Sequence, residues 1–252
     1  MNDLTTAFND YFEVVAADTQ ELQRHVFRMR YRVYCEELCL EGFDASAYPD
    51  GLEWDEYDQR SAHYLLRHRR RNEYVGTVRL ILPNAKNPEE RFPLEIHAAE
   101  RLSLEQSSRE RIPRDRLAEI SRLILSRSLR SRPGESDSPY STADNVPPGE
   151  QTMSRRRFPH PVLGLFVAIM RMSAQHAITH WYAGMEPVLN RLLRRFKVPL
   201  KAIGPVIQYH GARQPFVGVI NDVMRETYLG DREVWSFITE SGSIWPPPRL
   251  AA

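Results

Sequence analysis

The sequence predicts an α/β (α+β) fold in which one mixed central sheet carries helices on both faces. Three observations predict it. A short apolar strand leads into a long amphipathic helix near the N-terminus, a hairpin pattern follows at 63–82, and apolar helices alternate with strands after residue 160. The 252 residues suit one large core, so we expect a single domain over 1–252.

The N-terminal half begins with a strand and a helix. Residues 11–17 have the apolar content of a strand, and Asp18 followed by Glu21 is a capping-box pattern. A helix should then run from about 19 to 38. Its apolar face is formed by Leu22, Val26, Met29, Val33 and Leu38.

The following segments predict a hairpin and a central strand. Residues 40–61 are irregular and acidic, and strands at 63–68 and 74–82 flank a polar turn. Loops and short helical turns should fill 84–115. The apolar run 117–125 then reads as a buried strand at the centre of the sheet.

The C-terminal half predicts an insertion followed by alternating helices and strands. Residues 131–160 are rich in Pro, Gly and Ser, which predicts a flexible insertion. We then expect a helix over 161–177, a strand over 180–185 and a helix that starts at Pro187 and ends near 196. A strand pair at 203–210 and 214–220 and a peripheral helix at about 222–240 complete the chain.

Composition excludes several classes of protein. The 34 basic and 33 acidic residues give a net charge of +1, which does not favour nucleic-acid binding. The eight histidines lack metal-ligand spacing, so we expect no metal site. Cys35 and Cys39 are too few for a disulfide framework and fit a reduced protein. Without a signal-peptide pattern or a long apolar stretch, we expect a cytoplasmic protein with no stable membrane insertion.

The central strand contains three polar residues, Glu119, Ser121 and Arg122. Burying a carboxylate or a guanidinium is costly unless each is paired, so a chain that keeps both in an apolar segment is expected to use them. The alternative is a helix that carries ordinary charges on its surface.

These residues belong to a wider pattern in four segments. The segments carry, in order, Arg24, Phe27, Arg30, Tyr31 and Val33-Tyr34; Asp55 and Asp58 around Tyr57; Gly76, Arg79, Leu80 and Pro83; and Glu119, Ser121 and Arg122. This set resembles the acyl-homoserine lactone synthases of the GNAT-like acyltransferase superfamily. It resembles most closely the acyltransferases associated with PEP-CTERM/exosortase systems, over residues 10–220.

The resemblance implies a GNAT-like sheet and a defined reaction. A fatty acyl group would pass from the phosphopantetheine thioester of acyl carrier protein to a small amine, with acyl-CoA the less favoured donor and no permanently bound cofactor. Tyr34 stands where the lactone synthases usually have Trp, which weighs against S-adenosylmethionine as the acceptor. No nucleophile elbow occurs, so direct attack of the amine on the thioester fits better than a covalent enzyme intermediate.

The resemblance also implies which residues form the site. The charged cluster would contain Arg24, Asp55, Asp58, Arg79, Glu119 and Arg122, and the substrate side would add Phe27, Tyr34 and Ser121. Asp55 and Asp58 suit a cationic amine by charge attraction. Alternatively, part of this network only ties the N-terminal helix to the sheet.

The catalytic candidates are Glu119, Arg122 and Arg79. Aminolysis needs a neutral amine, and a buried Glu119 with a raised pKa can take its proton directly or through water. Arg122, three residues further on, points to the opposite face of a regular strand. Unless a bulge intervenes, it is better assigned to the structure or to the carrier side.

The donor side is defined by charge and by apolar residues. No Gly-x-Gly pattern follows the central strand, so a coenzyme A pyrophosphate cradle is not predicted. Acyl carrier protein is acidic, and a basic patch would help it dock. Candidates are Arg127, Arg130, Arg155 and Arg156, with solvated loop residues as the equal alternative. The helix 161–177 either walls an acyl pocket, through Leu163, Phe166, Val167, Ile169 and Met170, or is simply core.

Three functions therefore compete. The first is an N-acyltransferase that moves a fatty acyl group from acyl carrier protein to an amine, an amino acid being one candidate. The second is an acyl-homoserine lactone synthase that uses S-adenosylmethionine. The third is a non-catalytic module that binds an acyl group or a carrier. The sequence leaves the oligomeric state open.

Overall fold

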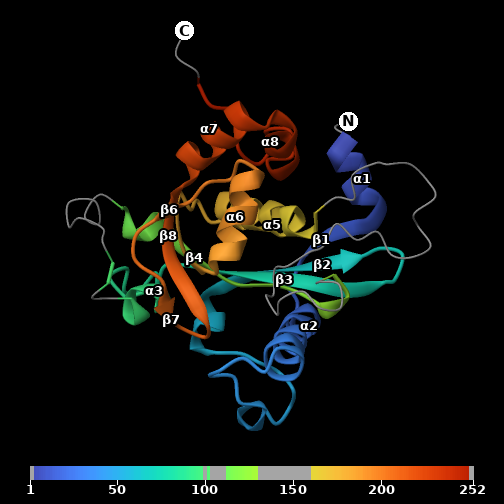
Figure 1. The fold of residues 1–252 in the computed structure, drawn as a ribbon, viewed down its shortest axis with the longest axis vertical. Coiled ribbons are helices and arrows are strands. Elements are labelled where there is room, and N and C mark those ends of the chain that lie inside the picture. The colour runs from blue at the N-terminus through green and yellow to red at the C-terminus, as the bar shows by residue number, and fades with distance from the viewer. Residues whose placement is uncertain (1–2, 99–100, 103–111, 130–159, 250–252) are drawn as a thin grey trace.

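The computed structural model describes residues 3–98, 101–102, 112–129 and 160–249. Within them, strands follow the order β1-β2-β3-β4-β5-β8-β6, with β7 paired to β8 (Figure 1). All neighbours pair antiparallel except β4 and β5, which are parallel. The strands are β1 (Phe12–Ala16), β2 (Ser61–His68), β3 (Glu73–Ile81), β4 (Leu117–Leu125), β5 (His180–Met185), β6 (Lys201–Ala202), β7 (Ile207–Gln208) and β8 (Ala212–Val219).

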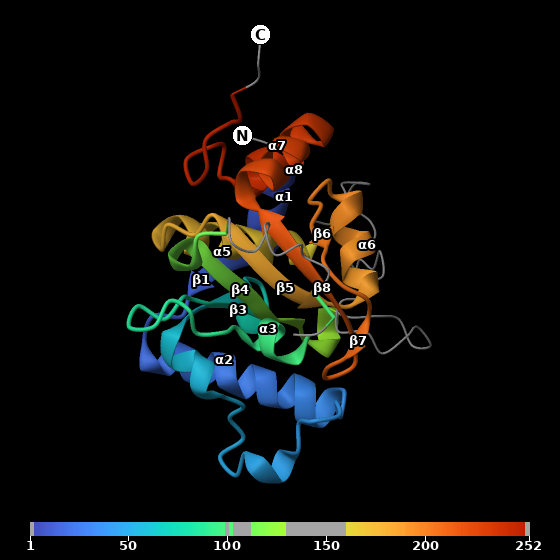
Figure 2. The ribbon, with the colours of Figure 1, turned by 90° about the vertical axis from the view of Figure 1, so that its left-hand side faces the viewer.

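Helices cover both faces of this sheet, which confirms the predicted mixed sheet. Figures 1 and 2 show α2 beneath the sheet and α5 above it, with α1, α7 and α8 on the α5 side. The helices are α1 (Asp3–Tyr11), α2 (Gln20–Tyr31), α3 (Pro93–His97), α5 (Pro161–Gln175), α6 (Pro187–Arg195), α7 (Ile220–Gly230) and α8 (Arg232–Ile238). None of the described helices is long and apolar enough to cross a membrane.

Most elements form where the patterns predict them, with differences at their ends, but the first helix, α1, was not predicted. The helix over 19–38 consists of α2 and a π-helical continuation, Arg32–Glu37. Its N-cap is Thr19, whose side chain accepts a hydrogen bond from Leu22 N, so the capping box at Asp18 and Glu21 was a wrong prediction. Within the strand expected at 203–210 only the two-residue strand β7 forms, and the two-residue strand β6 lies just before it.

The C-terminal segment is two helices rather than one. α7 and α8 supply buried side chains to the largest core cluster, among them Met224, Trp235 and Phe237. The helix expected at about 222–240 is therefore packed into the core. The insertion expected at 131–160 lies outside the described residues except for His160, the N-cap of α5.

The central strand β4 has two features that shape the molecule. Its pairing with β5 joins only Leu117–Ile120 to His180–Ala183, so the two parallel strands part after Ile120. On its other edge, the register with β3 shifts between Thr77 and Arg79, and Arg122 adopts a left-handed φ of 52°. This is a β-bulge, which places an extra residue on one strand and re-aims the side chains around it.

Candidate active site

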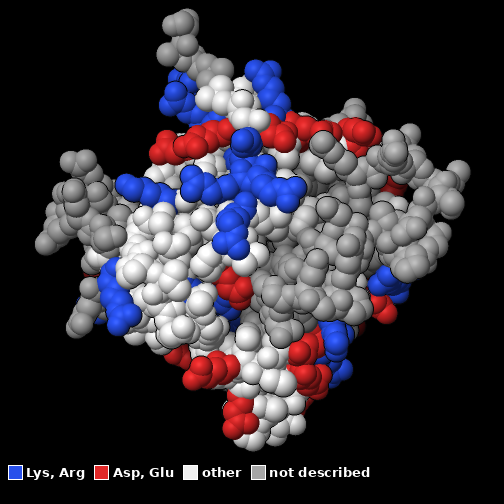
Figure 3. All heavy atoms as spheres, in the orientation of Figure 1, with Lys and Arg blue, Asp and Glu red and all other residues white. Residues whose placement is uncertain are grey.

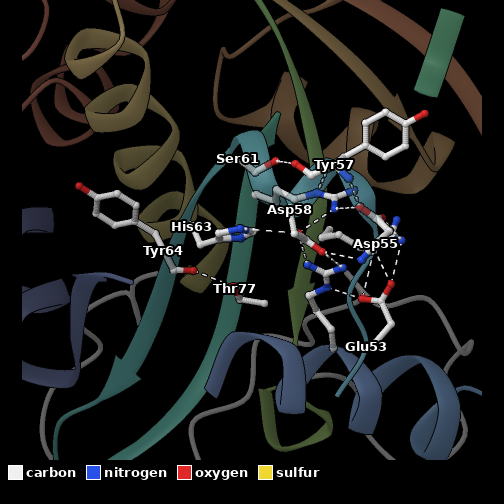
Figure 4. Close-up of polar contacts among 12 residues, drawn as sticks. Glu53, Asp55, Tyr57, Asp58, Ser61, His63, Tyr64 and Thr77 are labelled. Carbon is white, nitrogen blue, oxygen red and sulfur yellow. Dashed lines mark hydrogen bonds and ion pairs between the residues drawn. The ribbon is translucent and has the colours of Figure 1, made fainter. Parts of the chain in front are cut away.

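Three arginines and three carboxylates meet on the face of the sheet that α2 covers. The arginines come from three elements: Arg30 from α2, Arg79 from β3 and Arg122 from β4. The carboxylates all come from the acidic loop before β2, and Figure 4 shows Glu53, Asp55 and Asp58 converging there. Because the six charges balance, the cluster can be buried without a net charge.

Arg30 holds two of these carboxylates from below. Its side chain is fully buried, it hydrogen-bonds Glu53, and it grips Asp58 with both terminal nitrogens at 2.8 and 3.1 Å. Such bidentate contacts are among the strong charge-assisted hydrogen bonds. Arg30 therefore fixes the acidic loop to α2.

Arg79 and Arg122 hold the cluster from the sheet. Arg79 donates to Asp55 at 2.6 Å, to Asp58 at 2.8 Å and to the Ser121 hydroxyl at 2.9 Å. Arg122 Nη2 donates to Glu53 at 2.9 Å and to Asp55 at 3.0 Å. Each carboxylate thus faces two arginines.

The pairing decides the charge of Glu53 and Asp58. Burial alone would raise the pKa of Glu53, but Arg30 and Arg122 outweigh it and hold that pKa at about 2. Burial is likewise outweighed at Asp58, where Arg30 and Arg79 hold the pKa well below its ordinary value. Both carboxylates are therefore anionic at neutral pH and serve as fixed partners of the arginines.

Glu119 behaves in the opposite way. This residue of β4 is 4% exposed, and its side chain accepts a hydrogen bond of 2.8 Å from the Leu94 amide in α3. Burial raises the pKa of the Glu119 carboxyl to about 7, although the Leu94 amide and Arg79 act to lower it. A carboxylate that exchanges its proton near neutral pH is suited to act as a general base.

The bulge in β4 corrects the prediction for Arg122. In a regular strand Arg122 would share a face with Ile120, which packs in the core on the α5 side. Instead, Ser121 and Arg122 both reach the charged cluster, and Leu123 turns back into that core. The extra residue therefore places Arg122 on the same face as Glu119.

A small cavity marks the place where β4 and β5 part. Its volume is about 40 Å³. Its lining combines Ser121 and Arg122 on β4 with apolar residues of β5, α5 and α6. Among the apolar ones are Phe166, Met185, Leu189 and Leu193. The cavity therefore connects a polar strand edge with an apolar interior.

The helix α5 is mainly core. Leu163, Val167, Ile169 and Met170 are buried in the largest core cluster, and of the five predicted pocket residues Phe166 lines the cavity. The space that Gly164 leaves on α5 is filled, because a Cβ atom there would lie 2.3 Å from the Phe8 ring.

Aromatic side chains close the cluster on the α2 side. Tyr34, in the π-helical turn, stacks on Phe43 with ring centroids 4.5 Å apart. The Arg122 guanidinium carbon lies 5.6 Å from the Tyr34 ring centre and 5.1 Å from that of Phe43. The Arg30 guanidinium carbon lies 5.4 Å from the centre of the Phe27 ring, also a cation–π contact. Both predicted substrate-side aromatics thus contact arginines of the cluster.

Five predicted residues are not found in this cluster. Arg24 is exposed on α2. Arg30 occupies the position in the network that the resemblance implied for Arg24. Six residues turn a helix by about 600°, which puts the two arginines on different faces. Arg127 is exposed, with its backbone amide donating to Glu37. Arg130, Arg155 and Arg156 lie outside the described residues.

The predicted charged cluster left out two of its members, Arg30 and Glu53, and the neighbouring His63. Arg30 follows Val26 by four residues and so lies in the buried stripe of α2, a signal that could have found it. Glu53 was one acid among several in an irregular loop. His63, on β2, has its Nε2 3.6 Å from Asp58, and burial lowers its pKa to about 4, so the ring is neutral (Figure 4).

The part of the chain that forms the cluster matches a known protein family. The family model of the acetyltransferase (GNAT) domain matches residues 29–136, which include all members of the cluster. No curated protein sequence matches the chain. The family match and the fold support an acyltransferase of the GNAT type, as the sequence predicts.

Several solved structures share this fold. The N-acyl amino acid synthase FeeM from uncultured soil microbes has a TM-score of 0.55 at 13% identity, over 88% of this chain and 96% of its own. The CoA-dependent acyl-homoserine lactone synthase BjaI, solved with SAM and isopentyl-CoA, has a TM-score of 0.55 at 20% identity, over 95% of each chain. The AHL synthase LasI has a TM-score of 0.52 at 15% identity, over 82% and 87%. At these identities the likeness concerns the fold.

Proposed function

We propose that this protein is an N-acyltransferase that moves a fatty acyl group from the thioester of acyl carrier protein to the amine of a small acceptor such as an amino acid. The observation that carries the proposal is Glu119, a buried carboxylate with a pKa of about 7, beside the point where β4 and β5 part. The amine attacks the thioester carbonyl, its proton passes to Glu119, and the thiolate leaves.

The parted strands suit an extended thioester arm. Beyond Ile120 and Ala183 the facing edges of β4 and β5 do not pair with each other. Backbone amides and carbonyls at such an edge are available to an extended ligand, as in β-strand addition. An arm between the strands would bring its thioester beside Ser121 and Arg122, which line the cavity there.

The cavity can take an apolar acyl chain only if the side chains that line it move. Its volume of about 40 Å³ is close to that of a single water molecule, so a fatty chain must displace side chains. Met185, Leu189 and Leu193 are unbranched or γ-branched residues around it, and such side chains can change rotamer to admit a chain.

The outer face of α6 supports a carrier as the donor. Five exposed basic residues and no acidic one occur in 191–201, which covers the end of α6 and the segment after it. We call them the α6 basic face: Arg191, Arg194, Arg195, Lys197 and Lys201. Figure 3 shows Lys and Arg side chains gathered over α6 at the centre of that face. Leu189 and Leu193, on the inner face of the same helix, line the cavity. An acidic carrier bound to the α6 basic face would therefore lie next to the opening between β4 and β5, where the thioester arm is proposed to enter.

Asp55 is the carboxylate of the cluster that best suits contact with the acceptor. Its side chain is 22% exposed, whereas Asp58 is 5% exposed and Glu53 is fully buried. We therefore propose that Asp55 attracts the cationic amine before deprotonation, and that Asp58 holds the arginines in place.

The experiment is a matrix of donors and acceptors. Purified protein is incubated with dodecanoyl-acyl carrier protein or dodecanoyl-CoA, each with the common amino acids or with S-adenosylmethionine, and the products are identified by mass spectrometry. N-acyl amino acid from the carrier donor supports the proposal. A lactone product identifies the lactone synthase instead, and carrier binding without transfer to any amine identifies a non-catalytic module.

The cellular setting rests on the sequence resemblance. We infer from it an association with PEP-CTERM/exosortase systems and a place in the cytoplasm, where acyl carrier protein occurs. Lipid extracts of cells with and without the gene, compared by mass spectrometry, test whether a new N-acyl compound depends on the protein.

A further inference from the structure

Five rings from four segments form a continuous row beside the charged cluster. His97 in α3 stacks on Tyr209 at 3.9 Å between ring centroids, and Tyr209 contacts His210 at 4.6 Å. His210 contacts Phe43 at 4.6 Å, and Phe43 stacks on Tyr34 at 4.5 Å. We call these five rings, His97, Tyr209, His210, Phe43 and Tyr34, the aromatic arch.

The centre of the arch is the turn between β7 and β8. Tyr209 N donates to Gly211 O at 2.9 Å, and His210 has a left-handed φ of 50°. The turn reaches the acidic loop, where His210 Nδ1 lies 3.2 Å from the Glu41 carbonyl oxygen. A Cβ atom on Gly42 would lie 2.5 Å from the His210 ring, so this close approach depends on a glycine. The turn thus bridges α3 and the acidic loop, and Figures 1 and 2 both show β7 near α3.

The arch borders Arg122 and lies within electrostatic range of Glu119. Arg122 is in cation–π range of Phe43 and Tyr34. Tyr209 interacts electrostatically with Glu119, Arg122, Arg79 and Asp55. Burial, followed by the charge of Glu119, raises the pKa of Tyr209 to about 12, so its hydroxyl is neutral at neutral pH. A neutral phenol can border a carboxylate base without competing for its proton.

The arch is built from parts outside the regular sheet. α3, the β7–β8 turn and the acidic loop each contribute rings, and His97 and Tyr209 remain partly accessible at its outer end. A cover formed by ring contacts between separate segments can part without breaking the sheet. An acceptor can therefore enter beneath it and be enclosed afterwards.

Enclosure matters for this chemistry because water is an alternative nucleophile. If an amine attacks the thioester, a C–N bond forms, the C–S bond breaks and an amide and a thiol result. If water attacks, the same C–S bond breaks and a free fatty acid and a thiol result. A base such as Glu119 can activate either nucleophile, so the site needs a device that favours the amine.

We propose that the aromatic arch is this device: it closes over the acceptor and excludes water, so that Tyr209 and His97 set the ratio of amide to free fatty acid. The inference rests on the proposed function, since it presupposes transfer to an amine.

The test measures both products by mass spectrometry with dodecanoyl-acyl carrier protein and the amine that the wild-type protein accepts. We expect the ratio of free fatty acid to N-acyl product to rise about tenfold in Y209A and about threefold in H97A. Y209F keeps the ring and should stay within about twofold of the wild type. H25A is the matched control, because His25 is also an exposed histidine packed on a tyrosine, Tyr74, with ring centroids 5.0 Å apart.

The outcomes separate the two proposals. An unchanged product ratio in H97A and Y209A, with normal N-acyl product from the wild type, overturns the arch and leaves the proposed function intact. If the wild type makes no N-acyl product from any amine, both proposals fail. Should Y209A not fold, as judged by thermal unfolding, H97A decides alone, since His97 is exposed and its loss removes one stacking contact.

Discussion

At neutral pH the Glu119 carboxyl is close to half ionised, because burial raises its pKa to about 7. The same residue on an exposed strand would be fully ionised and would hold a proton poorly. Its Leu94 partner is a backbone amide, which donates to the carboxylate without supplying a counter-charge. The environment of Glu119 therefore sets a proton affinity suited to catalysis near neutral pH.

Replacing Glu119 by Gln should reduce kcat/KM for amide formation by about 10²–10³-fold, within the range of general base catalysis. In the wild type kcat/KM should rise with pH through about 7 as Glu119 loses its proton. E119Q should lack this rising limb of the pH profile. Steady-state kinetics across pH check both, with E90Q as a control whose profile keeps the limb. An unchanged rate in E119Q would show that another group takes the proton.

The same substitution has a stability readout that does not depend on catalysis. A folded-state pKa raised from 4.5 to about 7 means that stability is present below pH 4.5 and is lost as pH rises through 7. E119Q removes this loss, so thermal unfolding should show E119Q more stable than the wild type above pH 7. The two should be alike below pH 4.5. A wild-type advantage above pH 7 would contradict the assigned burial of the charge.

Arg30 and Arg24 differ in burial, and that difference predicts opposite effects. R30M leaves Glu53 and Asp58 without a main partner in a buried cluster and should destabilise the fold by about 3–5 kcal/mol. R24M changes an exposed side chain and should stay within about 0.5 kcal/mol of the wild type. Denaturant unfolding measures both. Equal effects would mean that the cluster is not the structural centre we describe.

At the scale of elements, the bulge in β4 and the parting of β4 from β5 create the site together. The bulge turns Arg122 toward the cluster, and the parted edges leave room beside the cavity. α5 packs against the sheet and leaves no open space at Gly164, because the Phe8 side chain from α1 fills the notch there.

Enlarging Gly164 should therefore disturb packing. G164A would place a methyl group 2.3 Å from the Phe8 ring, which Phe12 and Phe237 hold in place. We expect a loss of about 1–3 kcal/mol from overpacking, although Ala normally favours a helix over Gly. The double variant G164A/F8L should recover part of that loss, measured by a double-mutant cycle of denaturant unfolding. A stabilised G164A would show instead that the notch is open.

At the scale of the whole molecule, the net charge is close to zero but the charges are unevenly distributed over the surface. The net charge of +1 conceals the α6 basic face, which holds two of the three lysines of the chain. A uniform surface would give an acidic carrier no preferred approach. In the proposed function, the α6 basic face would instead direct it to the side of the molecule where the cavity lies.

Neutralising this face should weaken only the carrier donor. R191Q/R194Q/R195Q should raise KM for dodecanoyl-acyl carrier protein about five- to tenfold, with kcat nearly unchanged. It should leave KM for an acyl-pantetheine donor, which lacks the protein, unaffected. The wild-type KM should itself rise with salt.

R69Q/R70Q/R71Q, in the exposed turn between β2 and β3, makes the same charge change elsewhere and is the control. A KM that rises in R127Q and not in the α6 triple variant would move docking to the end of β4.

The sequence alone determined most of the order of strands and helices, the mixed sheet and the presence of Glu119, Arg79 and Arg122 in buried strands, because hydrophobic periodicity and misplaced charge are local properties. Tertiary structure alone decided the partners. Arg30 finds Glu53 at a separation of 23 residues and Arg122 finds it at 69, and no local pattern encodes such pairings. A single bulge also reversed the face on which Arg122 lies, since one extra residue shifts the two-residue period of a strand.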